Sequence, residues 1–212
     1  MVINLVIVDY GAGNLRSVSK ALERIGFPAS VTSDPGDVLD AAGVILPGVG
    51  SSGAAMAALE DRDLVKPLRH VVAQGTPFFG VCLGMQLLLD TSEEDPRPCL
   101  GIVPGGVTRL PSSVKVPHMG WNQVTLLRKH PVFYEVPTGA NFYFVHSYYA
   151  EPEDVSLVVG ATDYGVPFCS VLARDNLVAT QFHPEKSGPL GLRLYENFIR
   201  LMVLRGVRQS WR

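Results

Sequence analysis

Apolar residues in the first half of the chain alternate between short uninterrupted runs and stretches with helical spacing. An uninterrupted run is typical of a strand buried on both faces, and apolar positions three or four residues apart mark one face of a helix. The pattern predicts strands at 2–8, 29–32, 43–46 and 78–81. It predicts helices at 14–25, 53–59 and 64–74, and a further helix that begins after residue 82. This alternation indicates an α/β fold with a mostly parallel, flavodoxin-like central sheet flanked by helices.

The second half is richer in short strands separated by Gly, Pro, Asn and Asp. The expected strands are 101–110, 122–127, 141–145, 157–162, 166–174 and 177–182. Asp175 and Asn176 separate the last two strands and predict a two-residue hairpin turn. A helix is expected at 190–204, and the acidic, Pro-rich stretch 91–98 is expected to be an exposed loop. Because no linker or repeat interrupts the pattern, we expect residues 1–212 to form one domain, with additional antiparallel strands in its C-terminal half.

Composition narrows the functional class. The 212 residues include 18 Lys and Arg against 20 Asp and Glu without a basic block, so we expect no electrostatic binding to nucleic acid or membranes. The apolar run 2–8 is too short to span a bilayer and is interpreted as a strand. Cys82, Cys99 and Cys169 are odd in number and lack C-x-x-C spacing, which predicts neither a disulfide framework nor a metal site. These features favour the reducing cytoplasm.

Cys82 is the most informative residue for chemistry. It lies in the G-V-C-L-G sequence at 80–84, where the apolar pattern changes from strand to helix. A side chain on such a turn stands at the top of the sheet, and the flanking glycines leave room for the backbone, as in a nucleophile elbow. A helix that follows would point N–H groups at the sulfur and favour the thiolate. Taken alone, the pattern fits a packed core cysteine about equally well.

A downstream histidine strengthens the catalytic interpretation. His183 and Glu185 are two residues apart, so in an extended chain they would project to the same side. The carboxylate would then hold the imidazole in one tautomer while the other ring nitrogen faces the sulfur. Pro184 is expected to exclude helix and preserve this geometry. By itself the segment also fits a surface turn, but together with Cys82 it favours a Cys-His-Glu triad.

A glycine-rich loop follows the strand expected at 43–46. Attack of a thiolate on a carbonyl develops an oxyanion, which needs N–H donors about 3 Å away. The amide of Leu83 would supply one donor, and the loop of Gly48, Val49 and Gly50 would supply another because glycine permits a close approach or a peptide flip. The alternative is a tight strand-to-helix turn, which is favoured for Gly53.

At this level the chain resembles a known family. The G-V-C-L-G-M-Q sequence at 80–86 and H-P-E at 183–185 resemble the class I, triad-type glutamine amidotransferases. D-Y-G-A-G-N-L-R-S-V at 9–18 and P-H-M-G-W-N at 117–122 resemble the glutaminase subunits of imidazole glycerol phosphate synthases, as does P-G-V-G at 47–50. The similarity runs from about residue 2 to residue 201, and residues 203–212 match no part of it.

The resemblance implies a reaction and a partner. Cys82 would attack the amide of glutamine, and hydrolysis of the thioester would give glutamate and ammonia. The ammonia would pass to a (β/α)8-barrel cyclase subunit, in a heterodimer that makes imidazole glycerol phosphate and aminoimidazole carboxamide ribotide in histidine biosynthesis. No cofactor is implied. The residues implied to contact glutamine are Gln86, Ser147 and Tyr148, and those implied to lie at the partner interface and ammonia path are Asn14, Trp121 and Lys186.

Two other function classes remain open. One is a different cysteine hydrolase on a similar sheet, such as the glutaminase of pyridoxal phosphate synthesis, which we would not expect to carry both 9–14 and 117–122. The other is a non-catalytic flavodoxin-like binding module, which has no need of a triad. Among the remaining candidates, His118 is expected to be structural and His70 and His130 to lie at the surface, and Cys99 and Cys169 lack an activating context.

Overall fold

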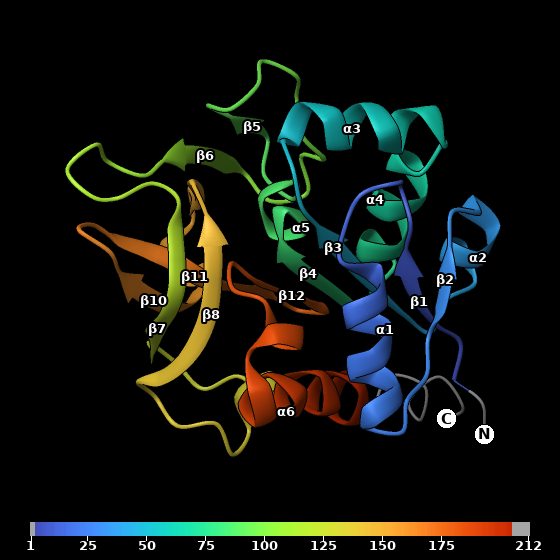
Figure 1. Cartoon of the computed structure of the whole chain (residues 1–212). Coiled ribbons are helices and arrows are strands. Elements are labelled where there is room, and N and C mark those ends of the chain that lie inside the picture. The colour runs from blue at the N-terminus through green and yellow to red at the C-terminus, as the bar shows by residue number, and fades with distance from the viewer. Residues whose placement is uncertain (1–2, 205–212) are drawn as a thin grey trace.

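The computed structural model describes residues 3–204 and has a twisted central sheet with helices on both sides (Figure 1). The first half of the chain and one later strand, β12, build the parallel part of this sheet, in the order β2-β1-β3-β4-β12. These strands are β1 (Leu5–Val8), β2 (Ser30–Thr32), β3 (Gly43–Gly48), β4 (Phe78–Cys82) and β12 (Leu177–Thr180). The predicted α/β class with a mostly parallel central sheet is therefore confirmed.

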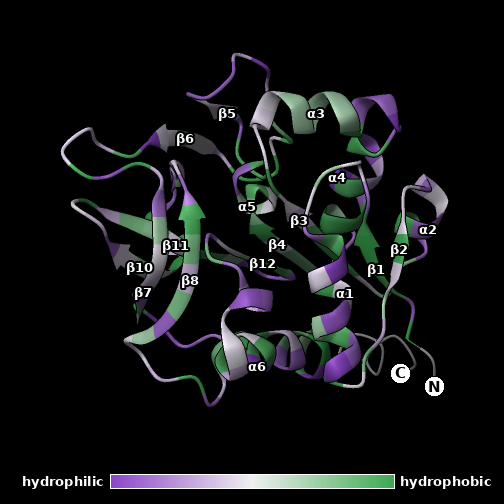
Figure 2. Cartoon of the chain, in the orientation of Figure 1, coloured by the Kyte–Doolittle hydropathy of each residue, from purple (hydrophilic) through white to green (hydrophobic). Residues whose placement is uncertain are grey.

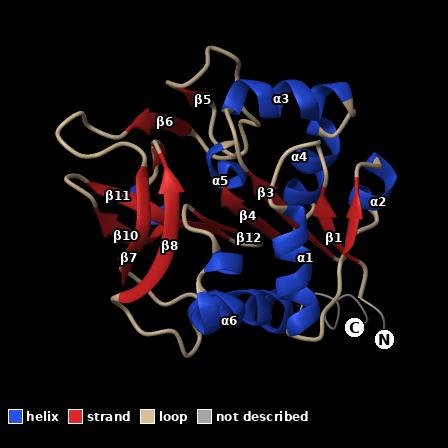
Figure 3. Cartoon of the chain, in the orientation of Figure 1, coloured by secondary structure: helices blue, strands red, loops and turns tan. Residues whose placement is uncertain are grey.

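Both faces of the parallel strands β1, β3, β4 and β12 are buried, because their apolar residues alternate between two cores, whereas the edge strand β2 is mostly exposed. In β1, Leu5 and Ile7 pack in one core while Val6 and Val8 pack in the other. α1 (Leu15–Arg24) and α6 (Gly188–Phe198) cover the first face, and α2 (Pro35–Leu39), α3 (Ser52–Asp61) and α4 (Val65–Ala73) cover the second (Figure 3). The apolar colour of β1 and β4 in Figure 2 reflects this two-sided burial.

Beyond β12 the sheet continues with antiparallel strands, as expected for the C-terminal half. Their order is β11 (Pro167–Arg174), β10 (Val158–Asp163), β7 (His118–Leu126) and β8 (Ala140–His146). A branch adds β9 (Tyr148–Pro152), β6 (Gly105–Arg109) and β5 (Thr91–Ser92). The predicted hairpin turn is confirmed, since Arg174 pairs with Leu177 across Asp175 and Asn176.

Several element boundaries differ from the sequence prediction. α2, β5 and β9 were not predicted, and β7 begins four residues before the expected strand 122–127. The helix expected at 190–204 is α6, which continues as a π-helix at Ile199–Val203. Short 3-10 helices are present at Pro131–Phe133, Val155–Leu157 and Pro184–Lys186. Part of the strand expected at 2–8 and most of segment 203–212 fall outside the described residues.

The carboxyl ends of β3 and β4 lie side by side, since Gly48 pairs with Cys82. β12 lies on the other side of β4 and leads into His183. All three candidate elements of the site therefore meet at one edge of the sheet, where parallel α/β folds place their ligands. Within residues 3–204 no helix has both the length and the apolar composition needed to cross a lipid bilayer.

Candidate active site

Cys82 occupies a sharp turn between β4 and the one-turn helix α5 (Leu83–Gln86). Its φ is +54° and its ψ is −110°, a backbone conformation that is strained for any residue except glycine. A side chain at Gly84 would run into the carbonyl of Leu46, so α5 can approach β3 this closely only with glycine there. The elbow predicted from the glycine spacing is thus present.

The helix after Cys82 is shorter than expected. α5 comprises four residues, so few aligned peptide dipoles act on the sulfur, and the expected helix effect is small. The sulfur instead lies among side chains and backbone from other elements. Gln181 Nε2 is 3.6 Å from Cys82 Sγ, and the Val145 carbonyl oxygen is 3.8 Å from it.

His183 and Glu185 are paired, but not through an extended chain as predicted. Pro184–Lys186 forms a 3-10 helix, and Pro184 takes its first position, where the missing N–H is tolerated. In this turn His183 Nδ1 lies 2.8 Å from Glu185 Oε1, with the two side chains 2% and 1% exposed. The prediction that proline excludes helix here was wrong, yet the tight turn still brings the carboxylate to the ring.

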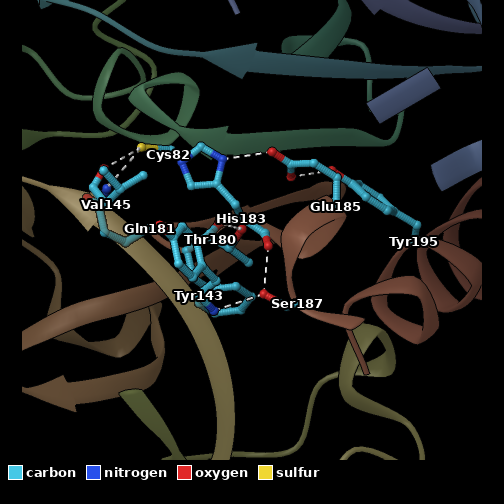
Figure 4. A network of polar contacts seen from close by, with 10 residues as sticks. Cys82, Tyr143, Val145, Thr180, Gln181, His183, Glu185, Ser187 and Tyr195 are labelled. Carbon is cyan, nitrogen blue, oxygen red and sulfur yellow. Dashed lines mark hydrogen bonds and ion pairs between the residues drawn. The ribbon is translucent and has the colours of Figure 1, made fainter. Parts of the chain in front are cut away.

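Two further residues hold this pair in place (Figure 4). Tyr195 on α6 donates to Glu185 Oε2 at 3.4 Å, and burial, followed by the nearby carboxylate, raises the pKa of Tyr195 far above its usual value. Ser187 Oγ donates to the His183 carbonyl at 2.6 Å and accepts from the Tyr143 amide at 3.0 Å. Sequence reasoning missed both, because neither a tyrosine in a helix nor a serine after a turn indicates its distant partner.

Figure 4 shows the imidazole ring of His183 between Cys82 and the Glu185 carboxylate. Burial alone would lower the pKa of His183, but its contacts with Cys82 and Glu185 outweigh burial and raise that pKa to about 10. The ring therefore holds a proton at neutral pH. Its Nε2 is buried and has no hydrogen-bond partner among the residues that the structure describes, which leaves this atom free to exchange a proton with a ligand.

The loop predicted to stabilise an oxyanion lies beside the sulfur. Tyr10 donates its hydroxyl to the Pro47 carbonyl at 3.1 Å and so fixes the start of the loop. Burial, and then the charge of Cys82, raise the pKa of Tyr10, which keeps this hydroxyl protonated. Gly50 has a φ of +94°, which only glycine adopts without strain. Gly48 ends β3 next to Cys82.

A cavity of about 390 Å³ opens in front of Cys82. It brings together most of the predicted site residues, both those inferred from their own sequence pattern (Val49, Gly50, Leu83 and His183) and those implied by the resemblance (Gln86, Ser147, Tyr148 and Lys186). Glu94 also lines it and was missed, because 91–98 was expected to be an exposed loop. Glu94 is half-buried and accepts from the Ser52 amide at 2.7 Å, which ties its loop to the start of α3.

Asn14 and Trp121 do not line this cavity. Asn14 precedes α1 as its N-terminal cap, and Trp121 is 58% exposed on β7. The ring of Tyr143 is near both Trp121 and the cavity residue Lys186: its centroid is 6.2 Å from the Trp121 ring and 5.8 Å from Lys186 Nζ. Trp121, Tyr143 and Lys186 therefore connect the mouth of the cavity to an exposed aromatic surface.

The other cysteines and histidines have different surroundings. Burial raises the pKa of Cys99 to about 11 and that of Cys169 to about 12, so both remain thiols at neutral pH. His118 is buried, in keeping with a structural role, and His70 is exposed as expected. The prediction of a surface position for His130 was wrong, since this side chain is half-buried and accepts from the Val132 amide. Among residues 3–204 no group of three or more His, Cys, Asp or Glu is placed to hold a metal ion.

Comparison with known proteins identifies close relatives. Residues 6–202 match the family described as glutamine amidotransferase class-I. The chain is 49% identical to imidazole glycerol phosphate synthase subunit HisH of Dehalococcoides mccartyi, over 94% of this chain and 98% of the relative. It is 51% identical to the HisH subunit of Moorella thermoacetica, over 93% and 95%. Among solved structures, PurLQS from Thermotoga maritima has a similar fold, with a TM-score of 0.74 at 20% identity over 95% of this chain and 99% of that one.

Proposed function

The chain belongs to the class-I glutamine amidotransferase family, and we propose that it hydrolyses glutamine and supplies the ammonia to a cyclase subunit of imidazole glycerol phosphate synthase. The observation that carries the chemistry is the buried His183–Glu185 pair next to a cysteine on an elbow. The relatives named HisH, about half identical over nearly the whole chain, carry the choice of pathway.

The proposed reaction uses the three residues in sequence. The Cys82 thiolate attacks the side-chain amide carbon of glutamine, and the oxyanion accepts hydrogen bonds from the backbone at Leu83 and at Gly48, Val49 and Gly50. The C–N bond then breaks as the His183 imidazolium gives its proton to the departing nitrogen, which releases ammonia and leaves a glutamyl thioester. His183, now neutral, takes a proton from water, whose hydroxide attacks the thioester. Glutamate leaves and the thiolate is restored.

The cavity also suits the other end of glutamine, which carries an ammonium and a carboxylate. Gln86 uses both Nε2 hydrogens on other protein groups, so its Oε1 is the atom it can offer to a ligand. Glu94 is the acidic side chain in the cavity lining. We assign the substrate ammonium to Glu94 and Gln86 Oε1, and contacts with the rest of glutamine to Ser147 and Tyr148.

The proposed partner covers the exposed aromatic surface beside the cavity. Met119 and Trp121 are 63% and 58% exposed on β7, which is unusual for large apolar side chains and typical of interfaces. We place the cyclase subunit here, with Lys186 and Asn14 near the ammonia path. In this proposal residues 1–212 act as one amidotransferase domain, and the heterodimer works in the cytoplasm with no cofactor on this chain.

A direct test separates the two half-reactions. Cys82→Ser in the complex should abolish synthesis with glutamine as nitrogen donor and preserve it when ammonium is supplied. Cys99→Ser is the matched control, because this thiol is buried away from the cavity. Equal glutamine-dependent synthesis by wild type and Cys82→Ser would refute the proposal.

A further inference from the structure

Gln181 contacts the reacting sulfur from a fully buried position, with 0% of the residue exposed. Its Nε2 donates to Cys82 Sγ at 3.6 Å (Figure 4). Its Oε1 accepts from Gln86 Nε2 at 2.9 Å. The same Gln86 Nε2 donates to the Tyr148 carbonyl at 2.7 Å. The result is a continuous amide chain from the cavity wall to the nucleophile.

The direction of this chain is fixed by its far end. A backbone carbonyl can only accept, so the amide of Gln86 must present nitrogen to the Tyr148 oxygen. The same nitrogen also donates to Gln181, so the Gln181 atom that faces it must be the acceptor, Oε1. The nitrogen of Gln181 is consequently left to face Cys82, and the sulfur meets a donor rather than an acceptor.

A donor at this point distinguishes the two protonation states of Cys82. The thiolate accepts from Gln181 Nε2, whereas the thiol donates to the Val145 carbonyl at 3.8 Å. The remaining groups that bear on the sulfur are His183, whose positive charge favours the thiolate, and Tyr10, which is buried and neutral. Since α5 is only one turn long, the local helix contributes little, and the amide of Gln181 is the side-chain donor that contacts the sulfur.

We propose that Gln181 is a further catalytic residue, whose amide, oriented through Gln86 by the Tyr148 carbonyl, stabilises the Cys82 thiolate. This inference rests on the proposed glutaminase function. Gln181 transfers no proton: it donates a hydrogen bond to the sulfur in the free enzyme and again when the C–S bond of the thioester breaks and the thiolate leaves. Hydrogen bonds to charged groups are stronger than those between neutral groups, so this contact favours thiolate over thiol.

The test compares Gln181→Met with Gln181→Glu, using Gln74→Glu as control. Methionine keeps the length of the side chain and removes the donor, and glutamate keeps the shape while turning the donor into an acceptor. Gln74 is exposed at the end of α4, far from the cavity. The readouts are the pH midpoint of iodoacetamide alkylation of Cys82, followed by peptide mass spectrometry, and kcat/KM for glutamine in the complex.

Both Gln181 variants should move the alkylation midpoint upward by about one pH unit and lower kcat/KM by about tenfold. Gln74→Glu should change neither. An unchanged circular dichroism spectrum and co-purification with the cyclase subunit show that the variant chain is folded, and the near-isosteric Gln181→Glu carries the test if Gln181→Met does not fold. An unchanged midpoint in folded Gln181 variants would overturn the inference. A wild-type complex without glutaminase activity would instead overturn the proposed function.

Discussion

Acidification should destabilise this fold through a buried pair of histidines at the wall of the cavity. His118 and His146 face each other across β7 and β8, with His118 Nδ1 and His146 Nε2 2.9 Å apart. His146 Nδ1 lies 2.9 Å from the Tyr148 carbonyl, which can only accept, so this nitrogen carries the hydrogen. His146 Nε2 must then accept from His118. Both rings are therefore neutral, and a proton added to His146 would break the contact between them.

The size of the effect follows from the pKa values. Burial, with smaller contributions from the charges of His118 and His183, lowers the pKa of His146 from 6.5 to about 3 despite its bond to the Tyr148 carbonyl. Burial also lowers the pKa of His130 to about 4. The unfolded chain takes up these protons below pH 6.5 while the folded chain does not, so the stability that depends on these two histidines is full above that pH and falls steadily as pH decreases toward 4 and then 3. The raised pKa of His183 has the opposite effect, but it acts above pH 6.5 and does not offset this loss.

Between pH 6.5 and 5, protonation of each of these two histidines in the unfolded chain should lower the free energy of unfolding by about 1.4 kcal/mol per pH unit, or about 2 kcal/mol in total. Together the loss of about 4 kcal/mol is a large part of the total of about 5–15 kcal/mol for a typical domain. At about 2–4 °C per kcal/mol for a chain of this size, Tm should fall by roughly 10 °C between about pH 6.5 and 5.

The assay is urea unfolding at a series of pH values between these limits. His146→Gln and His130→Asn should each reduce the pH slope by about 1.4 kcal/mol per unit, because each removes one proton taken up on unfolding. His70→Asn is the control, since His70 is exposed on α4 and should leave the slope unchanged. A wild-type stability that is flat over this range, or an unchanged slope in His146→Gln, would refute the reasoning.

Three further predictions concern the reaction. An electrophilic glutamine analogue should label Cys82 and spare Cys99 and Cys169, because burial keeps those two as thiols. Mass spectrometry of the labelled peptides identifies the modified cysteine. Preferential labelling of Cys99 or Cys169 would contradict the assignment. His183→Ala should be nearly inactive while Glu185→Gln keeps measurable turnover, because the histidine carries the proton and the glutamate orients it; equal rates for His183→Ala and wild type would exclude the triad. The isolated chain should be a poor glutaminase and should gain activity with the cyclase subunit and its ligand, because Gly50 permits a peptide flip in the loop after β3. Moving this loop from a 1:99 to a 99:1 ratio of active to resting conformation needs about 5.5 kcal/mol of differential binding. Full activity in the isolated chain would indicate a stand-alone hydrolase.

The sequence predicted the parallel half of the fold well because all of its strands except the edge strand β2 are buried on both faces. β1, β3 and β4 are continuous apolar runs for this reason, and no other element type explains them. The missed elements are short or polar. α2 has only five residues, although Asp34 followed by Pro35 is a helix-start signal that would have revealed it. β9 contains Glu151 and Pro152 and lacks a clear apolar alternation.

In the candidate site, too, some residues could be predicted from the sequence and others could not. Cys82, His183 and Glu185 lie in local sequence motifs, so spacing alone could suggest their roles, even though the turn at Pro184 was predicted incorrectly. The residues around them could not be inferred this way. Gln181 acts on Cys82 across a separation of 99 residues, and Tyr195 reaches Glu185 only because α6 packs beneath the turn. Only the tertiary fold brings such partners together.

The Tyr148 carbonyl links two hydrogen-bonded groups beside the site, the amide chain and the histidine pair. It accepts from Gln86 on one side and lies against His146 Nδ1 on the other, so a single backbone oxygen orients both an amide chain and a histidine pair. The amide chain ends at the Cys82 sulfur, and the histidine pair ends on β7, the strand that carries the exposed Trp121. A displacement of β7 by a bound partner would therefore act on the same oxygen that determines how Gln181 meets the nucleophile.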